Sequence, residues 1–296
     1  MKKLLLATSA LVMTAGIAAA DGHIKLSGDA RMGIVDDFGA VGPVFNSRAR
    51  VKFTLSGESD SGFSFGAEFR AGDAAAAASG TAGSVFISGG FGKLSMGDVD
   101  GAANAAVGHV DGVGYTGLSD LNESTFVGGG AKESILYEYS AGDFTAYLSS
   151  GQLETANDTY SVAAKYAAGN FTVSLGYENY QGVDLGGAGA DDVDHIILGV
   201  NGTFGAVTMK ARYGRADGTV NAAAFEGDQW ALSATYSANG LGLTVFAADD
   251  SEILGAEAWG LGASYDLGGG ATVAGGYSSN ETTGNDAFDL GLNFSF

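Results

Sequence analysis

The sequence predicts an all-β fold, a sixteen-stranded antiparallel transmembrane β-barrel. Three observations lead to this prediction: polar and apolar residues alternate along many short segments, the connections between the segments alternate in length, and charged residues keep to one phase. Successive side chains of a β-strand point to opposite faces, so a two-residue period indicates strands. Gly makes up 50 of the 296 residues without a G-x-y repeat, which excludes a collagen-like chain.

The N-terminal segment is expected to be a signal peptide, separate from the fold. Lys2 and Lys3 form a basic start, residues 4–17 are apolar, and residues 18–20 are the small alanines of a cleavage site. The apolar run is shorter than the about 20 residues that span a bilayer, which argues against an uncleaved anchor. We therefore expect a signal peptide at 1–20, cleaved on export, and a barrel formed by residues 21–296.

The alternation is clearest where one face of a segment is fully polar. Lys25, Ser27, Asp29 and Arg31 share one face of their segment, and the residues between them are apolar or Gly. Each such segment is expected to be one strand. Sixteen of them are found, at 24–35, 46–57, 62–71, 84–89, 92–98, 134–140, 143–151, 158–167, 170–180, 193–201, 206–214, 228–237, 241–249, 256–266, 271–279 and 286–296.

The connections between these segments fall into two classes. Short turns lie around Gly142, Gly169, Gly240 and Gly269, where Gly and Asn supply the positive φ of tight hairpins. Short turns at one end and long loops at the other are typical of an outer-membrane barrel. A soluble β-sandwich would not separate its turns by length in this way. Longer polar loops are expected at 98–133, 181–192 and 215–227.

The charged residues indicate which face meets lipid. A Lys or Arg that faces the bilayer midplane costs about 2–4 kcal/mol, so the lipid-facing phase should lack them. The polar phase is therefore expected to line a wet interior, and tyrosines near both strand ends to form two aromatic girdles. The residues of the polar phase are Lys25, Arg31, Arg48, Arg50, Lys52, Glu68, Arg70, Lys93, Glu138, Lys165, Lys210 and Arg212.

Composition excludes several classes of function. A formal net charge of −20 disfavours nucleic acid as a partner, because phosphates need Lys and Arg to neutralise them. The absence of Cys excludes a disulfide framework and thiolate metal clusters. His23, His109 and His195 lie far apart in the sequence, no nucleophile with a general base stands out, and we expect no enzymatic activity.

One segment offers weak candidates for a calcium site. Residues 186–194 match the calcium-binding nonapeptide of β-helix repeats, with Asp191, Asp192 and Asp194 as the candidate ligands. A single copy cannot stack into a β-roll, so a flexible outer loop is the competing interpretation. We expect no cofactor, with calcium ions possible in the loops.

Four segments carry a resemblance to a known family. Residues 26–33, 47–51, 92–98 and 260–270 resemble the general porins of alphaproteobacteria, and among these the sixteen-stranded trimeric porins of purple photosynthetic bacteria. The resemblance runs through the whole chain from residue 21, and it is weakest in the loops. It implies a homotrimer of water-filled barrels in the cell outer membrane, surrounded by lipid and lipopolysaccharide. It also implies that the terminal Phe296 is read by the barrel-assembly machinery.

The resemblance further implies that the third long loop folds inward and narrows each pore. In the family an acidic inward loop faces a basic barrel wall, and the two charges create a transverse field across the constriction. Residues 98–133 lack strand character, and a loop of this length is commonly functional. The expected acidic side is Asp98, Asp100, Asp111, Asp120 and Glu123, and the expected basic side is Arg31, Arg48, Arg50 and Arg70.

The four arginines lie on three consecutive predicted strands about 4.8 Å apart, so they should form one patch. Arg does not lose its charge in proteins, and the patch needs carboxylates or anions to offset its repulsion. We expect that only the 98–133 loop is long enough and acidic enough to reach across and supply those carboxylates. The alternative is that the loop acids only solvate an outer loop.

General diffusion of small hydrophilic solutes and ions is the function that this sequence predicts. A substrate-specific outer-membrane channel is the alternative, and it would be expected to carry a ladder of aromatic or charged residues along the lumen. The strongly acidic chain argues against a strong anion filter.

Overall fold

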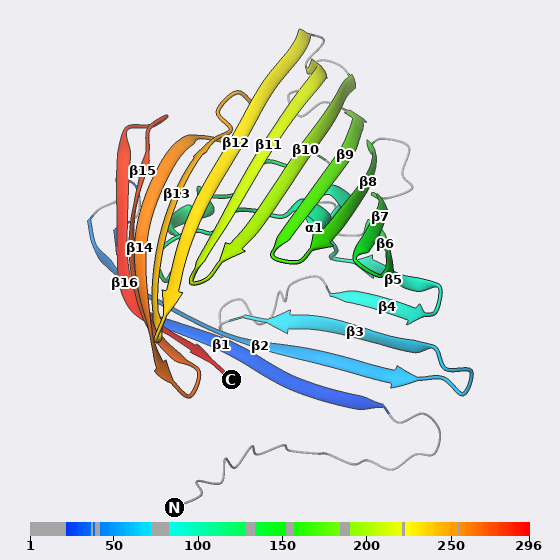
Figure 1. Ribbon diagram of the computed structural model, residues 1–296, viewed down its shortest axis with the longest axis horizontal. Coiled ribbons are helices and arrows are strands. Elements are labelled where there is room, and N and C mark those ends of the chain that lie inside the picture. The colour runs from blue at the N-terminus through cyan, green and yellow to red at the C-terminus, as the bar shows by residue number, and fades with distance from the viewer. Residues whose placement is uncertain are drawn as a thin grey trace, which may run out of the picture.

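In the computed structural model, residues 22–36, 38, 42–72, 83–127, 134–151, 157–183, 190–220, 223–253 and 255–296 are described. Within these ranges the chain forms one closed barrel in which each strand pairs antiparallel with its sequence neighbours, and β1 pairs with β16 to close the ring (Figure 1). The sixteen-stranded antiparallel barrel predicted from the sequence is confirmed. The expected signal peptide at 1–20 lies outside the described residues.

The strands follow the segments predicted from the alternation. They are β1 (His23–Asp36), β2 (Val44–Glu58), β3 (Ser64–Ala71), β4 (Ser84–Gly89), β5 (Gly92–Gly97), β6 (Ser134–Ala141), β7 (Phe144–Ser150), β8 (Asn157–Ala168), β9 (Phe171–Val183), β10 (Ala190–Phe204), β11 (Val207–Val220), β12 (Ala223–Ala238), β13 (Leu241–Asp249), β14 (Glu257–Gly268), β15 (Ala271–Asn280) and β16 (Asn285–Ser295). Two short helices, α1 (Ala102–Val107) and η1 (Leu118–Asp120), lie between β5 and β6. Neither helix in this described part of the chain is long or apolar enough to cross a bilayer.

Two of the expected outer loops are strand in the parts that the structure describes. The prediction of a loop at 215–227 is wrong, because β11 and β12 stay paired until Val220 meets Ala223. The prediction at 181–192 is wrong at both described ends, where β9 continues to Val183 and β10 begins at Ala190. The backbone ladder satisfies its own hydrogen bonds, so a hairpin can continue into water after its apolar face has ended. Polar sequence therefore ended the membrane-facing pattern without ending the strands.

The barrel carries its large apolar side chains on the outside. Leu26, Leu232 and Leu290 are 58%, 51% and 55% exposed, although each lies within a strand that is paired on both sides. Their neighbours along the chain form the opposite, inner phase, which is rich in polar residues and Gly. This reversal of the usual arrangement is that of a barrel surrounded by lipid with a polar interior.

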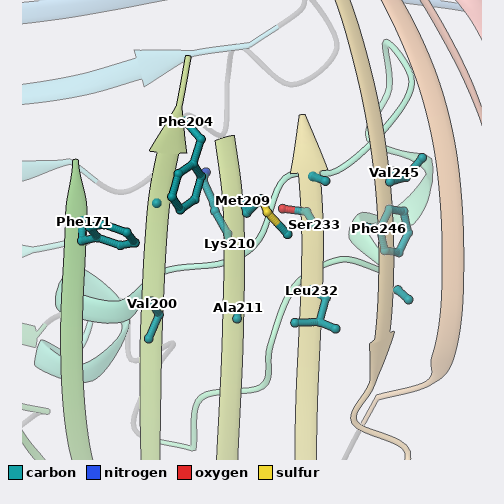
Figure 2. Close-up of a pocket in the computed structure, with 13 residues that line it drawn as sticks. Phe171, Val200, Phe204, Met209, Lys210, Ala211, Leu232, Ser233, Val245 and Phe246 are labelled. Atoms are coloured by element: carbon teal, nitrogen blue, oxygen red, sulfur yellow. The ribbon is translucent and has the colours of Figure 1, made fainter. Parts of the chain in front are cut away.

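An apolar groove of about 480 Å³ crosses the outer face between β9 and β13. Phe171, Phe204, Met209, Leu232 and Val245 line it, and each of these side chains is exposed (Figure 2). The groove exists because small outward residues lie opposite large ones in the register, so that Met209 stands between Gly202 and Ala234, and Leu232 stands between Ala211 and Ala247. These four small residues also line the groove.

The wall of the barrel is uneven in height. Strands β4 and β5 have 6 residues each, whereas β10 has 15 and β12 has 16. A transmembrane strand needs about 9–11 residues to cross the hydrocarbon core. The wall is therefore too short on one side to span a bilayer on its own and tall on the other.

Candidate functional site

The segment between β5 and β6, here called the long loop (residues 98–127), packs inside the barrel. Its helix α1 contacts β7, β8, β9 and β10, and η1 contacts β15 and β16 (Figure 1). Ala102, Ala103 and Leu118 of this loop are almost completely buried. The wall residues that bond to it belong to the inner phase of their strands, so the loop lies against the inner face and crosses the interior.

The loop begins on the inner wall through hydrogen bonds to two serines. The backbone N–H of Ala102 donates to Ser149 Oγ on β7, and that of Ala103 donates to Ser161 Oγ on β8, both at 2.8 Å. These bonds satisfy amides at the start of α1 that have no partner within the helix. Gly176 on β9 makes room, because a Cβ there would lie 2.6 Å from the Ala103 Cβ.

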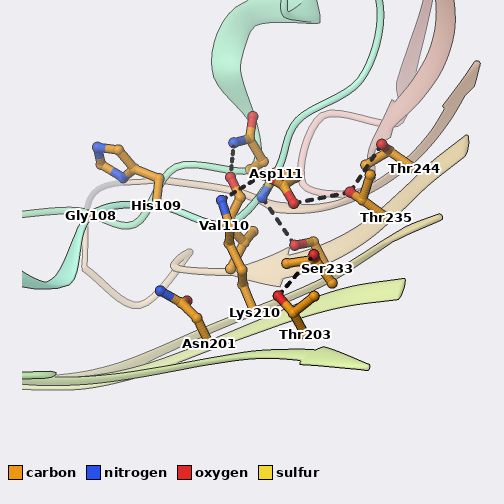
Figure 3. Close-up of polar contacts among 12 residues, drawn as sticks. Gly108, His109, Val110, Asp111, Asn201, Thr203, Lys210, Ser233, Thr235 and Thr244 are labelled. Atoms are coloured by element: carbon orange, nitrogen blue, oxygen red, sulfur yellow. Dashed lines mark hydrogen bonds and ion pairs between the residues drawn. The ribbon is translucent and has the colours of Figure 1, made fainter. Parts of the chain in front are cut away.

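A second group of bonds holds the loop after α1, where Asp111 lies between β11 and β12. Lys210 Nζ lies 2.6 Å from Asp111 Oδ1, and Thr235 Oγ1 donates to Asp111 Oδ2 at 3.0 Å. The Asp111 amide donates to Ser233 Oγ, so three wall side chains converge on one loop residue (Figure 3). Arg212, which is buried, donates to the carbonyl of Gly108 at 2.9 Å.

A third group holds the tip of the loop near η1. The amide and the hydroxyl of Thr116 donate to Asp289 Oδ2 on β16 at 2.7 and 2.6 Å. Arg31 on β1 donates to the Thr116 carbonyl at 3.1 Å. Burial raises the pKa of the adjacent Tyr115 phenol, and the Asp289 carboxylate raises it further, so the phenol stays protonated. A Cβ at Gly114, where φ is 82°, would overlap the Asp289 carboxylate.

The last described part of the loop is held by wholly buried polar side chains. The Thr125 amide donates to Gln229 Oε1 on β12, and the Val127 amide donates to Glu178 Oε1 on β9, both at 2.9 Å. His195 on β10 lies between these two wall residues. Asp250, just after β13, accepts from the Thr125 hydroxyl at 2.7 Å.

The arginines expected on the basic side of the constriction lie on β1, β2 and β3. Arg31 faces Arg48 across the β1–β2 ladder, and Lys52 faces Arg70 across the β2–β3 ladder, so these side chains share the inner face. We call Arg31, Arg48, Arg50 and Arg70 the basic wall.

The counter-charge of the basic wall differs from the prediction. Asp29 Oδ2 lies 3.1 Å from Arg48 Nη2, and Asp29 Oδ1 lies 3.0 Å from Arg50 Nε. The reasoning that the long loop alone could supply carboxylates to these arginines is therefore wrong. Asp29 stands opposite Arg50 in the ladder, and a carboxylate in that register needs no loop to reach its partner.

The five predicted loop acids are not equivalent. Asp111 is bound to Lys210 on the far wall, whereas Asp98, Asp100, Asp120 and Glu123 are exposed. Asp98 and Asp100 border a cavity of about 390 Å³ that lies between the loop and β3–β6. Glu123 lies 3.8 Å from His109 within the loop itself. Of the five, Asp111 is the one whose charge is taken up by an anchoring contact.

The calcium candidates do not converge. Asp191 is buried on the inner phase of β10, whereas the neighbouring Asp192 is exposed on the outer phase. Asp194 shares the outer phase and accepts a hydrogen bond from Asn179. Adjacent residues of a strand point to opposite faces, so the three carboxylates cannot enclose one ion. In the described ranges no group of three or more His, Asp or Glu side chains is arranged to hold a metal.

The wall residues that bond the loop were missed at the level of sequence. Ser161, Gln229 and Asp289 lie on the polar phase, where they look like any other lumen residue. Their partners lie 58, 104 and 173 residues away in the chain. What distinguishes these residues is that their polar side chains are buried, and burial is visible only in the folded chain.

Comparison with known proteins agrees with this architecture. Residues 7–286 match the family model described as Gram-negative porin. A porin of Rhodobacter capsulatus is 42% identical over 216 residues, which cover 67% of this chain and 69% of that protein. A solved porin structure is 35% identical with a TM-score of 0.80, covering 93% of this chain and 100% of the other. A variant of the Rh. blastica porin, 23% identical with a TM-score of 0.71 and the same coverage, shares the fold.

Proposed function

The chain belongs to the Gram-negative porin family, and we propose that its long loop and basic wall together form the constriction of the pore. As a porin it lies in the outer membrane and is a channel for passive diffusion of small hydrophilic solutes and ions. The observation that supports a constriction is the loop itself, whose bonds to wall residues run from Ser149 on β7 to Asp289 on β16. A segment held across the lumen must narrow it.

The constriction has a basic side and an acidic side. On the basic side Arg48 and Arg50 remain partly exposed, at 32% and 21%, while paired with Asp29. On the acidic side we place Asp98, Asp100, Asp120 and Glu123, because their carboxylates are exposed. We leave Asp111 out of the facing set because Lys210 binds it. Fixed charges of opposite sign across a narrow lumen orient water and dipolar solutes and favour them over apolar molecules.

A bilayer recording tests this function. The purified protein in a planar membrane under a salt gradient should give stable water-filled pores whose conductance scales with bulk salt. Saturation by one solute, with block of the ion current, would favour the substrate-specific channel instead. We expect no enzymatic activity in either case, because the family is one of channels.

We propose that the barrels assemble as homotrimers through the short side of the wall. The 6-residue strands β4 and β5 cannot span the bilayer alone, so protein rather than lipid should cover them. Phe65, Phe69, Val85 and Met96 are exposed apolar side chains on this side. Val85→Arg should convert an unheated, detergent-extracted trimer to monomers, whereas Leu175→Ser on the tall side should leave the trimer intact.

We propose that membrane lipid covers the tall side, with acyl chains in the groove lined by Phe204, Met209 and Val245 and lipopolysaccharide around the outer rim. Phe296 ends the chain beside β1, where its amide donates to the Gly28 carbonyl at 3.0 Å. Its recognition by the barrel-assembly machinery, like export through a cleaved leader at 1–20, stays a prediction. Phe296→Ser should lower the amount of inserted barrel while leaving the conductance of inserted pores unchanged.

A further inference from the structure

We propose that Glu178, His195 and Gln229 form a buried anchor that positions the end of the long loop, and that this anchor holds only while His195 is neutral. The inference rests on the proposed function, because the loop must bound the pore for its position to matter. The three residues stand on β9, β10 and β12, facing the interior.

Burial makes this cluster unusual for a water-filled barrel. Glu178 is 0% exposed, and His195 and Gln229 are 1% exposed. Burying polar groups of this kind costs free energy unless each finds a partner. Here the partners come from the long loop, through the backbone of Thr125 and Val127.

The hydrogen bonds fix the orientation of the Gln229 amide. A backbone N–H can only donate, so the atom that accepts from Thr125 is Gln229 Oε1. The other end, Nε2, then donates to the Thr125 carbonyl at 2.8 Å and lies 2.8 Å from His195 Nε2. Both protons of the amide are thereby used.

The amide in turn fixes the state of His195. Because Gln229 Nε2 donates, His195 Nε2 must accept and carries no proton. The single ring proton then lies on Nδ1, which donates to Glu178 Oε1 at 2.7 Å. Glu178 Oε1 also accepts the Val127 amide, so the loop is bound at both ends of one chain of hydrogen bonds.

The lack of space around Gly214 shows how tightly the hydrogen-bonded side chains are packed. The His195–Gln229 contact passes over β11 at Gly214, where a Cβ would lie 2.7 Å from His195 Nε2 and 3.0 Å from the Gln229 amide nitrogen. Any larger residue at this position would force the two side chains apart. Phe126 of the loop packs edge-on against the His195 ring, with centroids 6.3 Å apart.

Protonation of His195 would break the arrangement. A second ring proton on Nε2 would point at the Gln229 amide hydrogens, donor against donor. Rotating the amide would satisfy His195 but would leave the Thr125 amide and carbonyl without their partners. Histidine is the side chain that takes up a proton in weak acid, so acidification should release Thr125 from the wall.

Other charged groups lie near the cluster, on the strands and on the loop. Asp191 lies on the same face of β10, and Asp250 binds the Thr125 hydroxyl. On the loop, His109 and Glu123 lie beyond Phe126, and Arg212 on β11 binds the loop backbone. A control must therefore separate His195 from the other histidine of the site.

The test is single-pore recording of the full-length trimer between pH 7.5 and pH 5, with heat-modifiable trimer on gels as proof of folding. Wild-type pores should show few brief closures at pH 7.5 and several-fold more at pH 5. Gln229→Leu, which removes the loop bonds, should close as often at pH 7.5 as wild type does at pH 5. Gly214→Ala should act in the same direction more weakly.

His195→Gln is the decisive variant. A glutamine can donate to Glu178 and accept from Gln229 without titrating, so these pores should stay quiet at both pH values. His109→Gln should keep the wild-type acid response. A wild-type pore without an acid response, an acid response that survives His195→Gln, or one abolished by His109→Gln would each overturn the proposal. If wild type formed no ion-conducting pores, the proposed function would fail as well. If Gln229→Leu pores had normal conductance and few closures at pH 7.5, the anchor alone would be refuted.

Discussion

Two regions of the barrel interior differ in the bonding partners of their polar and charged side chains. We call β7–β12 the anchoring wall. Its inward polar side chains bond to the long loop, as Ser161, Lys210 and Gln229 do. On β1–β3 the basic wall keeps its charge within the strands, because Asp29 binds Arg48 and Arg50. The loop is thus fastened along β7–β12 and, at its tip, by Arg31 on β1 and Asp289 on β16, whereas Arg48 and Arg50 are paired within the wall itself. Polarity on an inner face can therefore serve either structure or permeation, and the partner decides which.

The largest expected effect follows from neutralising the basic wall. In the double variant Arg48→Ala and Arg50→Ala, the free Asp29 carboxylate is left facing the lumen. Conductance should rise, and the reversal potential under a salt gradient should move strongly towards cation preference. The Debye length falls from about 8 Å at physiological salt to about 3 Å at 1 M, so the shift should shrink at high salt.

Arg215→Ala is the matched control for that variant. Arg215 on β11 is paired with Glu226 and Asp228, on the outer phase of the tall wall. Its loss should leave the reversal potential unchanged. An equal shift from Arg215→Ala would mean that selectivity reflects total charge, and the contrast between the two walls would disappear.

A smaller effect is expected from the exposed loop acids. Asp98→Asn with Asp100→Asn should move the reversal potential towards anions, opposite in sign to the arginine variant. Each carboxylate is exposed beside the 390 Å³ cavity, so its field is better screened by water than that of the arginines. No change in reversal potential would place the acidic side of the constriction elsewhere.

A still smaller effect should separate Asp111 from the other loop acids. Lys210→Met removes the cation 2.6 Å from Asp111 and leaves that half-buried carboxylate without its ion-pair partner. The pore should gain a slight cation preference. The loop should also detach from the wall more often, because one of its anchoring contacts is lost. Asp111→Asn together with Lys210→Met should restore the wild-type reversal potential, which a long-range effect of Lys210 on the lumen would not do.

The smallest effect on permeation should come from the serines that hold α1. Ser161→Ala leaves the Ala103 amide buried without an acceptor, which costs about 1–3 kcal/mol. Hydrogen exchange at the start of α1 should become faster while conductance barely changes. Ser140→Ala, at the exposed turn end of β6, is the control, and exchange there should not affect α1.

Much of the fold could be predicted from sequence because strand patterning is local. In β1 the alternation of Lys25, Ser27, Asp29 and Arg31 defined both the strand and its inner face, and the ladder to β2 confirms their shared side. The basic wall was predictable for the same reason. The hairpin at 215–227 was not, because backbone pairing can continue where the side-chain pattern stops.

The partners of the charged residues were beyond local patterning. Asp29 was visible as an inward residue, but its role as counter-ion depends on the register that sets it opposite Arg50. Asp111 was grouped with the other loop acids, and only the path of the loop brings it to Lys210, 99 residues away. His195 seemed isolated in the sequence, yet folding places it between Glu178 and Gln229.

The sequence by itself determined the number of strands, their faces and the barrel that these faces require. The reason is that the two-residue alternation of polar and apolar side chains is a property of neighbouring residues. The tertiary structure alone decided which inner side chains hold the long loop and which are left to face the lumen. A hydrogen bond or an ion pair needs atoms within about 3–4 Å. For residues such as Thr116 and Asp289, 173 positions apart, that proximity exists only after the barrel has closed around the loop.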